Sequence, residues 1–115
     1  NMPFILGVVG SAAQGTRRSS GGGGGYGTIT GYYNSTGQSA KFCSRIGNAA
    51  TTVYFAGSGT KTFSQAYNSG SVIYSDTALT TSASAGIYGD NNGGTSNSWF
   101  DWRVGSGWAS TGTCP

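Results

Sequence analysis

Thr51-Thr52-Val53-Tyr54-Phe55-Ala56 is the stretch that predicts the fold class, because it gathers β-branched and aromatic residues in one short run. Gly57-Ser58-Gly59 follows it as a hairpin-type turn. Further runs of strand-like character, divided by turn residues, occur at residues 28–33, 41–46, 62–67, 71–75, 87–88 and 99–104. Short strands at this regular spacing predict an all-β fold, a small antiparallel sandwich or barrel with long Gly-rich loops. Residues 78–85 have room for one helical turn at most.

Composition supports the same fold class and excludes several kinds of site. The chain has 115 residues, of which 22 are Gly and only 8% are charged, and it contains no His. A long helical bundle is excluded because its exposed faces need more charged residues, and a His-ligated metal site or a His-based catalytic group is impossible. The net charge is +3 and the one basic pair is Arg17-Arg18, so we expect no nucleic-acid partner.

The first 25 residues divide into two segments ahead of the β domain. Residues 1–10 form an apolar arm, carried by Phe4, Ile5, Leu6, Val8 and Val9. The apolar run is too short for a spanning helix, so we expect that it does not insert into a membrane. It also lacks the basic region of a secretory signal, so we expect the protein to be made without a signal peptide. Residues 11–25, with five consecutive glycines, predict a flexible linker, and residues 26–115 the domain. The arm either adds a strand to its own domain or docks on a partner.

Cys43 and Cys114 are the only cysteines. Two cysteines cannot supply a four-cysteine zinc site, and a catalytic cysteine would need a His partner. We therefore favour a structural disulfide over two free thiols.

The three acidic residues do not predict catalysis. Any two of Asp76, Asp90 and Asp101 would satisfy the carboxylate requirement of a glycosidase. Their turn-like or alternating contexts instead favour turn capping and surface pairing with Arg103. The loop after Asp90 lacks the spacing of a calcium loop, and the glycine run lacks the Lys-Ser/Thr of a phosphate loop. We expect no enzyme activity, no metal and no cofactor.

The aromatic residues near the C-terminus are the better functional candidates. Trp99, Trp102 and Trp108 lie close together in sequence, and Tyr88 precedes them. Alternation along a strand points Trp99 and Trp102 to opposite faces, so we expect one in the core and the other exposed. Exposed Trp and Tyr side chains stack on sugars or fill partner pockets, which makes these four residues candidates for receptor or glycan contact. The alternative is that they build a core poor in Leu, Ile and Val.

Two stretches resemble known protein families. Met2-Pro3-Phe4-Ile5-Leu6-Gly7-Val8-Val9 resembles the apolar start of small virion proteins of tailed bacteriophages. A longer ordered series, centred on Tyr74-Ser75-Asp76-Thr77-Ala78-Leu79-Thr80-Thr81, is similar to a short C-terminal module of phage tail and fibre proteins and of some bacterial surface proteins. It also includes Tyr33, Cys43 and residues 52–55, 72–73, 85–90 and 111–114. The resemblance implies a β module exposed on a virion or outside the cell, with no catalytic residues.

These observations favour a non-enzymatic bacteriophage virion protein, a tail or fibre component that exposes Tyr and Trp loops for host attachment. Its expected partners are other virion proteins, copies of itself in a homo-oligomer with a trimer favoured, and a host-surface glycan. One alternative is a capsid decoration or cement protein. A second is a secreted carbohydrate-binding or adhesive module.

Overall fold

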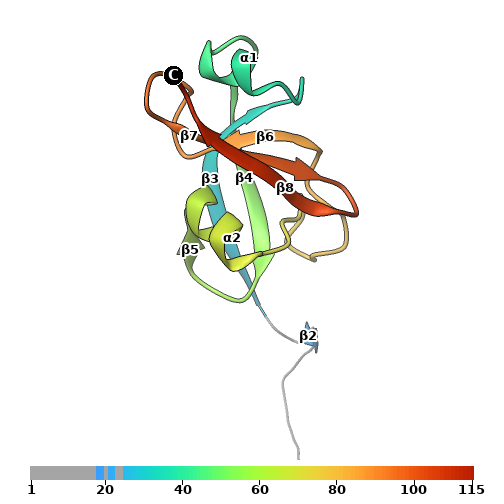
Figure 1. Cartoon of the computed structure of the whole chain (residues 1–115). Coiled ribbons are helices and arrows are strands. Elements are labelled where there is room, and N and C mark those ends of the chain that lie inside the picture. Colours follow the sequence, from blue (N-terminus) through green and yellow to red (C-terminus); the bar gives the residue numbers. More distant parts are fainter. Residues whose placement is uncertain (1–17, 20, 23–24) are drawn as a thin grey trace, which may run out of the picture.

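The computed structural model describes residues 18–19, 21–22 and 25–115 (Figure 1). The predicted docking arm lies outside these residues, as does most of the predicted linker. The domain's strands are β3 (Tyr26–Asn34), β4 (Ala49–Ala56), β5 (Thr60–Lys61), β6 (Gly86–Gly89), β7 (Ser98–Arg103) and β8 (Gly107–Thr113). Its helices are α1 (Ser39–Cys43) and α2 (Phe63–Ser69), and a separate pair joins β1 (Arg18–Ser19) and β2 (Gly21–Gly22). The predicted all-β class is confirmed.

The six strands of the domain form one sheet, with the order β4-β3-β6-β7-β8 and with β5 attached to β3. β3 pairs along its length with β4, from Tyr26 opposite Ala56 to Tyr33 opposite Ala49. Its other edge is shared, because β5 pairs with its first half in parallel and β6 with its last three residues. All other pairings within this sheet are antiparallel. β4 and β8 therefore end the sheet on its two sides.

The turn at Gly57-Ser58-Gly59 does not close a hairpin, which corrects the prediction. β5 lies across β3 from β4, so the chain passes over the beginning of β3. The Thr28 N–H donates to the Gly59 carbonyl at 2.9 Å, and the Gly57 N–H donates to the Gly25 carbonyl at 3.2 Å. This placement depends on contacts with a strand far back in the sequence, which no local turn pattern reveals.

Two predicted strands are helices instead. The segment 62–67 contributes α2, which begins with a capping box between Thr62 and Gln65 and ends at Gly70 in the left-handed conformation. The segment 41–46 overlaps the end of α1, whose one buried side chain is Phe42. The segment 71–75 is not a strand, although Tyr74 makes isolated bridges to Tyr54 and Ser82. No helix forms at residues 78–85.

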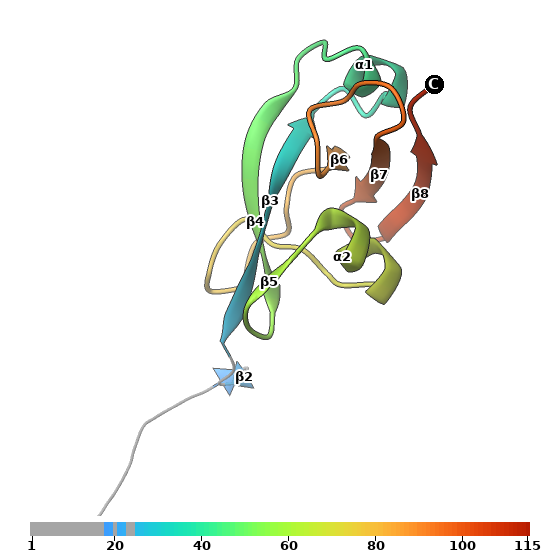
Figure 2. The same ribbon diagram turned by 90° about the vertical axis from the view of Figure 1, so that its left-hand side faces the viewer.

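The core has two clusters, one near each helix. Figure 2 shows β3 and β4 on one side of the domain and β7 and β8 on the other, with α1 near the top of the domain and α2 below β7 and β8. The larger cluster joins the sheet to α2 and is made of Ile29, Val53, Phe55, Phe63, Ala66, Ile73, Ala83, Tyr88, Phe100 and Trp102. The smaller cluster joins α1 to the end of β8 through Phe42, Ile87 and Cys114.

The predicted disulfide is present. Cys43 is bonded to Cys114, and 71 positions in the sequence separate the two residues. The bond joins the last residue of α1 to the segment after β8. It therefore closes a loop that contains most of the domain.

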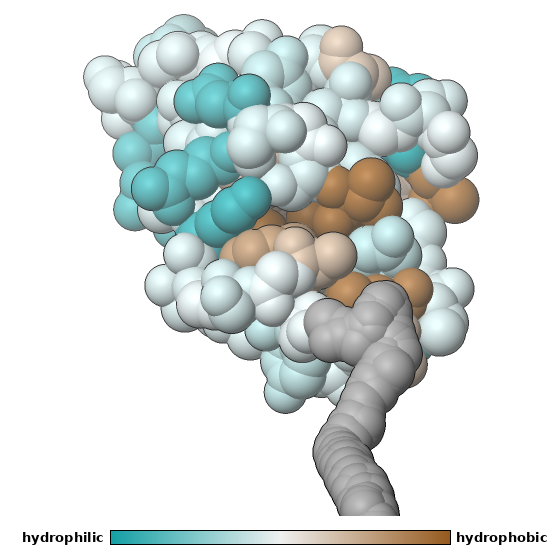
Figure 3. Space-filling model, turned by 90° about the horizontal axis from the view of Figure 1, so that it is seen from below, coloured by the Kyte–Doolittle hydropathy of each residue, from teal (hydrophilic) through white to brown (hydrophobic). Residues whose placement is uncertain are grey.

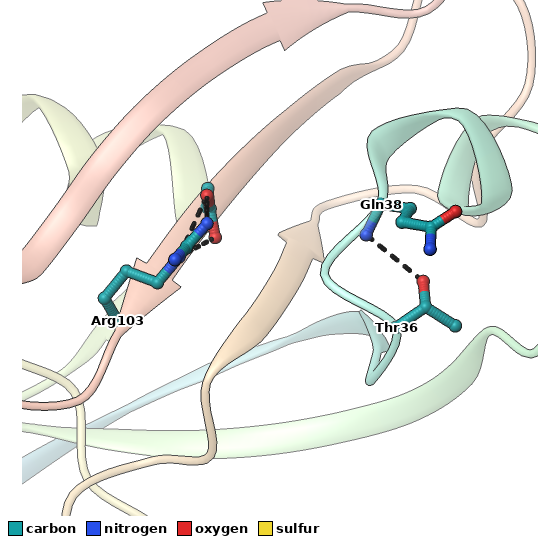
Figure 4. A network of polar contacts seen from close by, with 4 residues as sticks. Thr36, Gln38 and Arg103 are labelled. Atoms are coloured by element: carbon teal, nitrogen blue, oxygen red, sulfur yellow. Dashed lines mark hydrogen bonds and ion pairs between the residues drawn. The ribbon is translucent and has the colours of Figure 1, made fainter.

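A buried polar network holds the end of β3. Asn34 is fully buried, and its amide donates to the Ile46 carbonyl and to the Asn48 side chain, both at 2.8 Å. Its carbonyl oxygen accepts from the backbone and hydroxyl of Thr36. The Thr36 hydroxyl in turn accepts from the Gln38 N–H at 3.2 Å (Figure 4). All hydrogen-bonding positions of the Asn34 side chain are thus used.

Neither helix of the described residues has the length and apolar character that crossing a membrane requires.

Candidate binding site

An open pocket of about 600 Å³ lies between the β7–β8 hairpin, the C-terminal end of α2 and the segment that follows α2. Three aromatic side chains, Tyr67, Trp102 and Trp108, contribute to its lining. The other lining residues are small or apolar, namely Gly70, Val72, Ser82, Gly105, Ser106 and Gly107. We call this hollow the Trp108 pocket.

Glycines shape the mouth of the Trp108 pocket. Gly105 and Gly107 have φ angles of 86° and 84° and let β7 turn back into β8. Gly70 has a φ of 67° and ends α2. A Cβ at Gly70 or Gly105 would meet no atom within 4 Å, so the missing side chains leave open space there.

Hydrogen bonds fix both indole rings of the pocket. The Trp108 Nε1–H donates to the Ser71 carbonyl at 2.8 Å, and the Trp102 Nε1–H donates to the Ala83 carbonyl at 3.1 Å. The two rings meet edge to face, with 5.0 Å between their centroids, and Tyr67 packs edge to face on Trp108 at 5.9 Å. Because its N–H group already has a partner, the half-buried Trp108 ring offers apolar surface to a ligand.

The lining of the Trp108 pocket is largely apolar, and its small polar side chains are the hydroxyls of Ser82 and Ser106. Val72 is 50% exposed there, and among the described residues no Lys, Arg, Asp or Glu lines the pocket. Val104, on the same hairpin, is 58% exposed and does not line it. Figure 3 shows a domain face on which apolar side chains gather amid polar ones.

The structure brings two of the four aromatic candidates to the Trp108 pocket. Trp108 is half-buried, whereas Trp102 is only 2% exposed and serves mainly as core. Trp99 points to the opposite face of β7, as predicted, but it is half-buried against the smaller cluster. The prediction that one of the pair is core holds for Trp102, and Trp99 is less exposed than expected.

Tyr88 is a core residue, which corrects its proposed role in surface contact. It is 2% exposed, and its ring packs on Tyr33, Phe63 and Trp108. Its hydroxyl donates to the Ser84 carbonyl at 2.7 Å. Burial raises the pKa of Tyr88 well above its ordinary value. The residue supports the Trp108 pocket from beneath.

Tyr67 and Val72 are pocket residues that the sequence did not single out. Tyr67 was assigned to a strand, and only the helical geometry of α2 turns it toward Trp108. Val72 lies in an irregular segment whose course no local pattern specifies.

The three acidic side chains have separate structural roles. Asp76 accepts from the backbone of Thr80 and Thr81 in an exposed turn, and hydrogen bonds, foremost that from the Thr80 hydroxyl, lower its pKa. Asp90 accepts from the first N–H groups of α2, at 2.6 and 3.3 Å, and from a hydroxyl of that helix. The contacts of Asp76 bear out the predicted turn capping, whereas Asp90 caps the start of a helix distant in sequence, which the sequence did not predict.

Asp101 pairs with Arg103, as predicted, through two guanidinium nitrogens (Figure 4). The shortest distance is 2.8 Å, and the carboxylate side chain is 9% exposed against 57% for Arg103. The pair is therefore less superficial than expected. Hydrogen bonding to Asp101 raises the pKa of Arg103. Within residues 18–19, 21–22 and 25–115, no three His, Cys, Asp or Glu side chains gather as a metal site would need.

Two further hollows are less suited to an extended ligand. One, of about 490 Å³, lies over β3 and β4 and is lined mainly by Thr and small residues, with Tyr32 and Asp90. The other, of about 420 Å³, lies beside the disulfide and contains Trp99. Each has a single aromatic side chain, whereas the Trp108 pocket has three. The Trp108 pocket is therefore the strongest candidate site.

Comparison with protein-family models, with curated proteins and with solved structures finds no match to this chain.

Proposed function

We propose that this chain is a non-enzymatic structural protein of a bacteriophage virion, a tail or fibre component that attaches to a host surface through the Trp108 pocket. The single observation that carries the attachment role is the pocket itself. It combines three aromatic side chains with an exposed valine, and the part of the chain that the structure describes places no charged side chain in its lining. Concave sites lined by aromatic and apolar side chains with a few polar groups are typical of ligand binding.

The Cys43–Cys114 disulfide supports an exposed location. Disulfides persist in oxidising surroundings outside the cell and are rare in the cytosol. Such a bond would form late in a protein that assembles in the host cytoplasm and is then released on a particle. The same bond also fits a secreted adhesive module, which stays the second candidate.

The proposal includes association with copies of itself and with other virion proteins. β8 ends the sheet, and within the described part of the chain no further strand pairs with it. An exposed strand edge of this kind is a surface on which another strand can pair. The apolar residues 4–9 supply a second surface for a partner.

Antibody-gold labelling of purified particles, viewed by electron microscopy, tests the location. Label at a tail end supports the proposal, and label over the shell replaces it with capsid decoration. No label on any particle would overturn the virion assignment and favour the secreted module.

Deletion of residues 1–10 tests the docking arm. We expect the shortened chain to fold but not to be incorporated into particles, because the deletion removes the apolar run that docks on the partner. Circular dichroism checks folding, and immunoblotting of purified particles measures incorporation. If the shortened chain unfolds, the arm is a strand of the domain and its docking role is wrong.

A further inference from the structure

We infer that the Trp108 pocket binds an uncharged sugar ring of a surface glycan. The inference rests on the proposed function, since it names the ligand chemistry of the same site. It is argued from the size of the pocket, the chemistry of its walls and its lack of charge.

The size of the pocket suits a small ligand. Its volume of about 600 Å³ lies within the range of roughly 300–1,000 Å³ that is usual for small-molecule sites. The opening lies between the β7–β8 hairpin and the end of α2, where Gly70 and Gly105 leave the space free. A ring that is part of a longer glycan can enter such a site while its neighbours stay in solvent.

The walls offer the two kinds of contact that a sugar ring needs. Tyr67 and Trp108 supply apolar aromatic surface, and the indole N–H of Trp108 is already used in its bond to Ser71. The C–H groups on one face of a sugar carry partial positive charge and pack on the negative face of an aromatic ring. Ser106 is an exposed residue of the lining and brings a hydroxyl to it. The hydroxyl of Ser82 donates to the Ala83 carbonyl, which leaves its oxygen able to accept.

The lining, as formed by residues 25–115, carries no charged side chain, and this selects an uncharged ligand. Arg103 is the cation next to the hairpin turn, and its guanidinium is paired with Asp101 on two nitrogens. A carboxylate or phosphate entering the pocket would lose hydration without gaining an ionic partner, which is costly. Acidic and phosphorylated sugars are therefore expected to bind less well than uncharged ones.

Three tryptophans give the experiment an internal control. Each has one indole N–H signal in a nitrogen–proton correlation spectrum of the full chain. The probes are methyl glucoside, methyl galactoside, methyl mannoside and N-acetylglucosamine, with glucuronic acid and glucose 6-phosphate as charged counterparts. We expect at least one uncharged sugar to shift the Trp108 signal in a saturable way and to leave that of Trp99 in place, because Trp99 lies on the opposite face of β7.

Two matched pairs of variants connect the shifts to the pocket. Ser106→Arg places a long charged side chain at the rim and is expected to weaken sugar binding by about tenfold or more. Ser58→Arg is its control, since Ser58 is also exposed but does not line the pocket. Val72→Ser is expected to weaken binding by roughly three- to fivefold, because less apolar surface is covered, whereas Val104→Ser is expected to have no effect.

The outcomes distinguish this inference from the proposed function. If no sugar shifts Trp108, if the charged sugars bind as tightly, or if Ser106→Arg changes nothing, the sugar assignment is overturned. If the chain binds a sugar but antibody-gold labelling finds it on no particle, only the virion assignment is overturned. If the Trp108 signal shifts only as the concentration of the chain itself is raised, the occupant is a segment of another copy and the sugar inference fails.

Discussion

Reduction of the Cys43–Cys114 bond is expected to destabilise the domain strongly. The bond closes a loop of 71 positions, which includes every strand from β4 to β8. On the loop-entropy model, a cross-link of this length stabilises the folded state by about 4.4 kcal/mol at 25 °C, because it restricts the unfolded chain. Single domains have total stabilities of about 5–15 kcal/mol, so this bond supplies a large share.

The folded state itself is expected to lose little on reduction. Cys114 is 3% exposed and packs with Phe42 and Ile87, and these contacts remain when the two sulfurs are protonated. The effect is therefore expected mainly in the unfolded chain. That chain becomes more expanded, so the dependence of the unfolding free energy on denaturant should become steeper.

Urea unfolding with and without a phosphine reductant, followed by tryptophan fluorescence, measures the effect. We expect a loss of about 4 kcal/mol together with a steeper denaturant dependence. The double variant Cys43→Ser/Cys114→Ser is the control, and the reductant should leave it unchanged. A loss below about 1 kcal/mol with an unchanged slope would show that the bond does not constrain the unfolded chain as argued.

Three further predictions concern the helix cap, the buried network at Asn34 and the buried tyrosines. Asp90→Ala removes the carboxylate that caps α2 and is expected to lower the free energy of unfolding in urea by about 1–2 kcal/mol. Asp76→Ala, in an exposed turn, is expected to have a smaller effect. Equal effects of the two variants would refute the capping role of Asp90. Asn34→Asp replaces the buried NH2 group, which donates two hydrogen bonds, with an oxygen that only accepts. We expect the free energy of unfolding to fall by about 3 kcal/mol or more, and an unchanged unfolding midpoint would contradict the buried network. Burial raises the pKa of Tyr33 and Tyr88 above 10.0, so the folded chain keeps protons that the unfolded chain releases, and stability should fall as the pH rises above about 10. An absorbance titration at high pH should show Tyr88 ionising only as the domain unfolds, and ionisation of Tyr33 and Tyr88 near their ordinary pKa in the folded state would disprove it.

The strands that the sequence predicted correctly are those with dense β-branched and aromatic residues. β4 combines Val53, Tyr54 and Phe55 with threonines, and β7 contains Trp99, Phe100 and Trp102. β8 was missed because its sequence is mostly Gly, Ser, Thr and Ala, and as an edge strand it buries little. Its pairing with β7 is what makes it a strand.

The sequence of α2 carries helical signals, although a strand is predicted there. Phe63, Ala66 and Tyr67 have the spacing of one helical face, and Thr62 with Gln65 forms a capping-box pattern. These signals compete with the strand propensity of Thr62, Phe63 and Tyr67 in the same run. Inward packing of Phe63 and Ala66 and capping by Asp90 favour the helix.

The candidate site was only partly visible in the sequence. The tryptophans near the C-terminus were recognised as functional candidates, and Trp108 lies in the pocket. Which tryptophan is accessible depends on the register shift between Asp101 and Trp102, which has no local signature. It depends also on the hairpin turn at Gly105-Ser106-Gly107, which repeats the Gly-Ser-Gly pattern of residues 57–59. Tyr67 and Val72 reach the pocket through tertiary packing alone.

Retention of the full chain on bacterial cells of the source culture tests the central claim that the Trp108 pocket is the attachment surface. Fluorescently labelled wild-type chain and the Ser106→Arg and Ser58→Arg variants are compared by flow cytometry at equal concentration. We expect the wild type and Ser58→Arg to be retained equally and Ser106→Arg to lose most of its signal. Equal retention of all three chains would contradict attachment through this pocket.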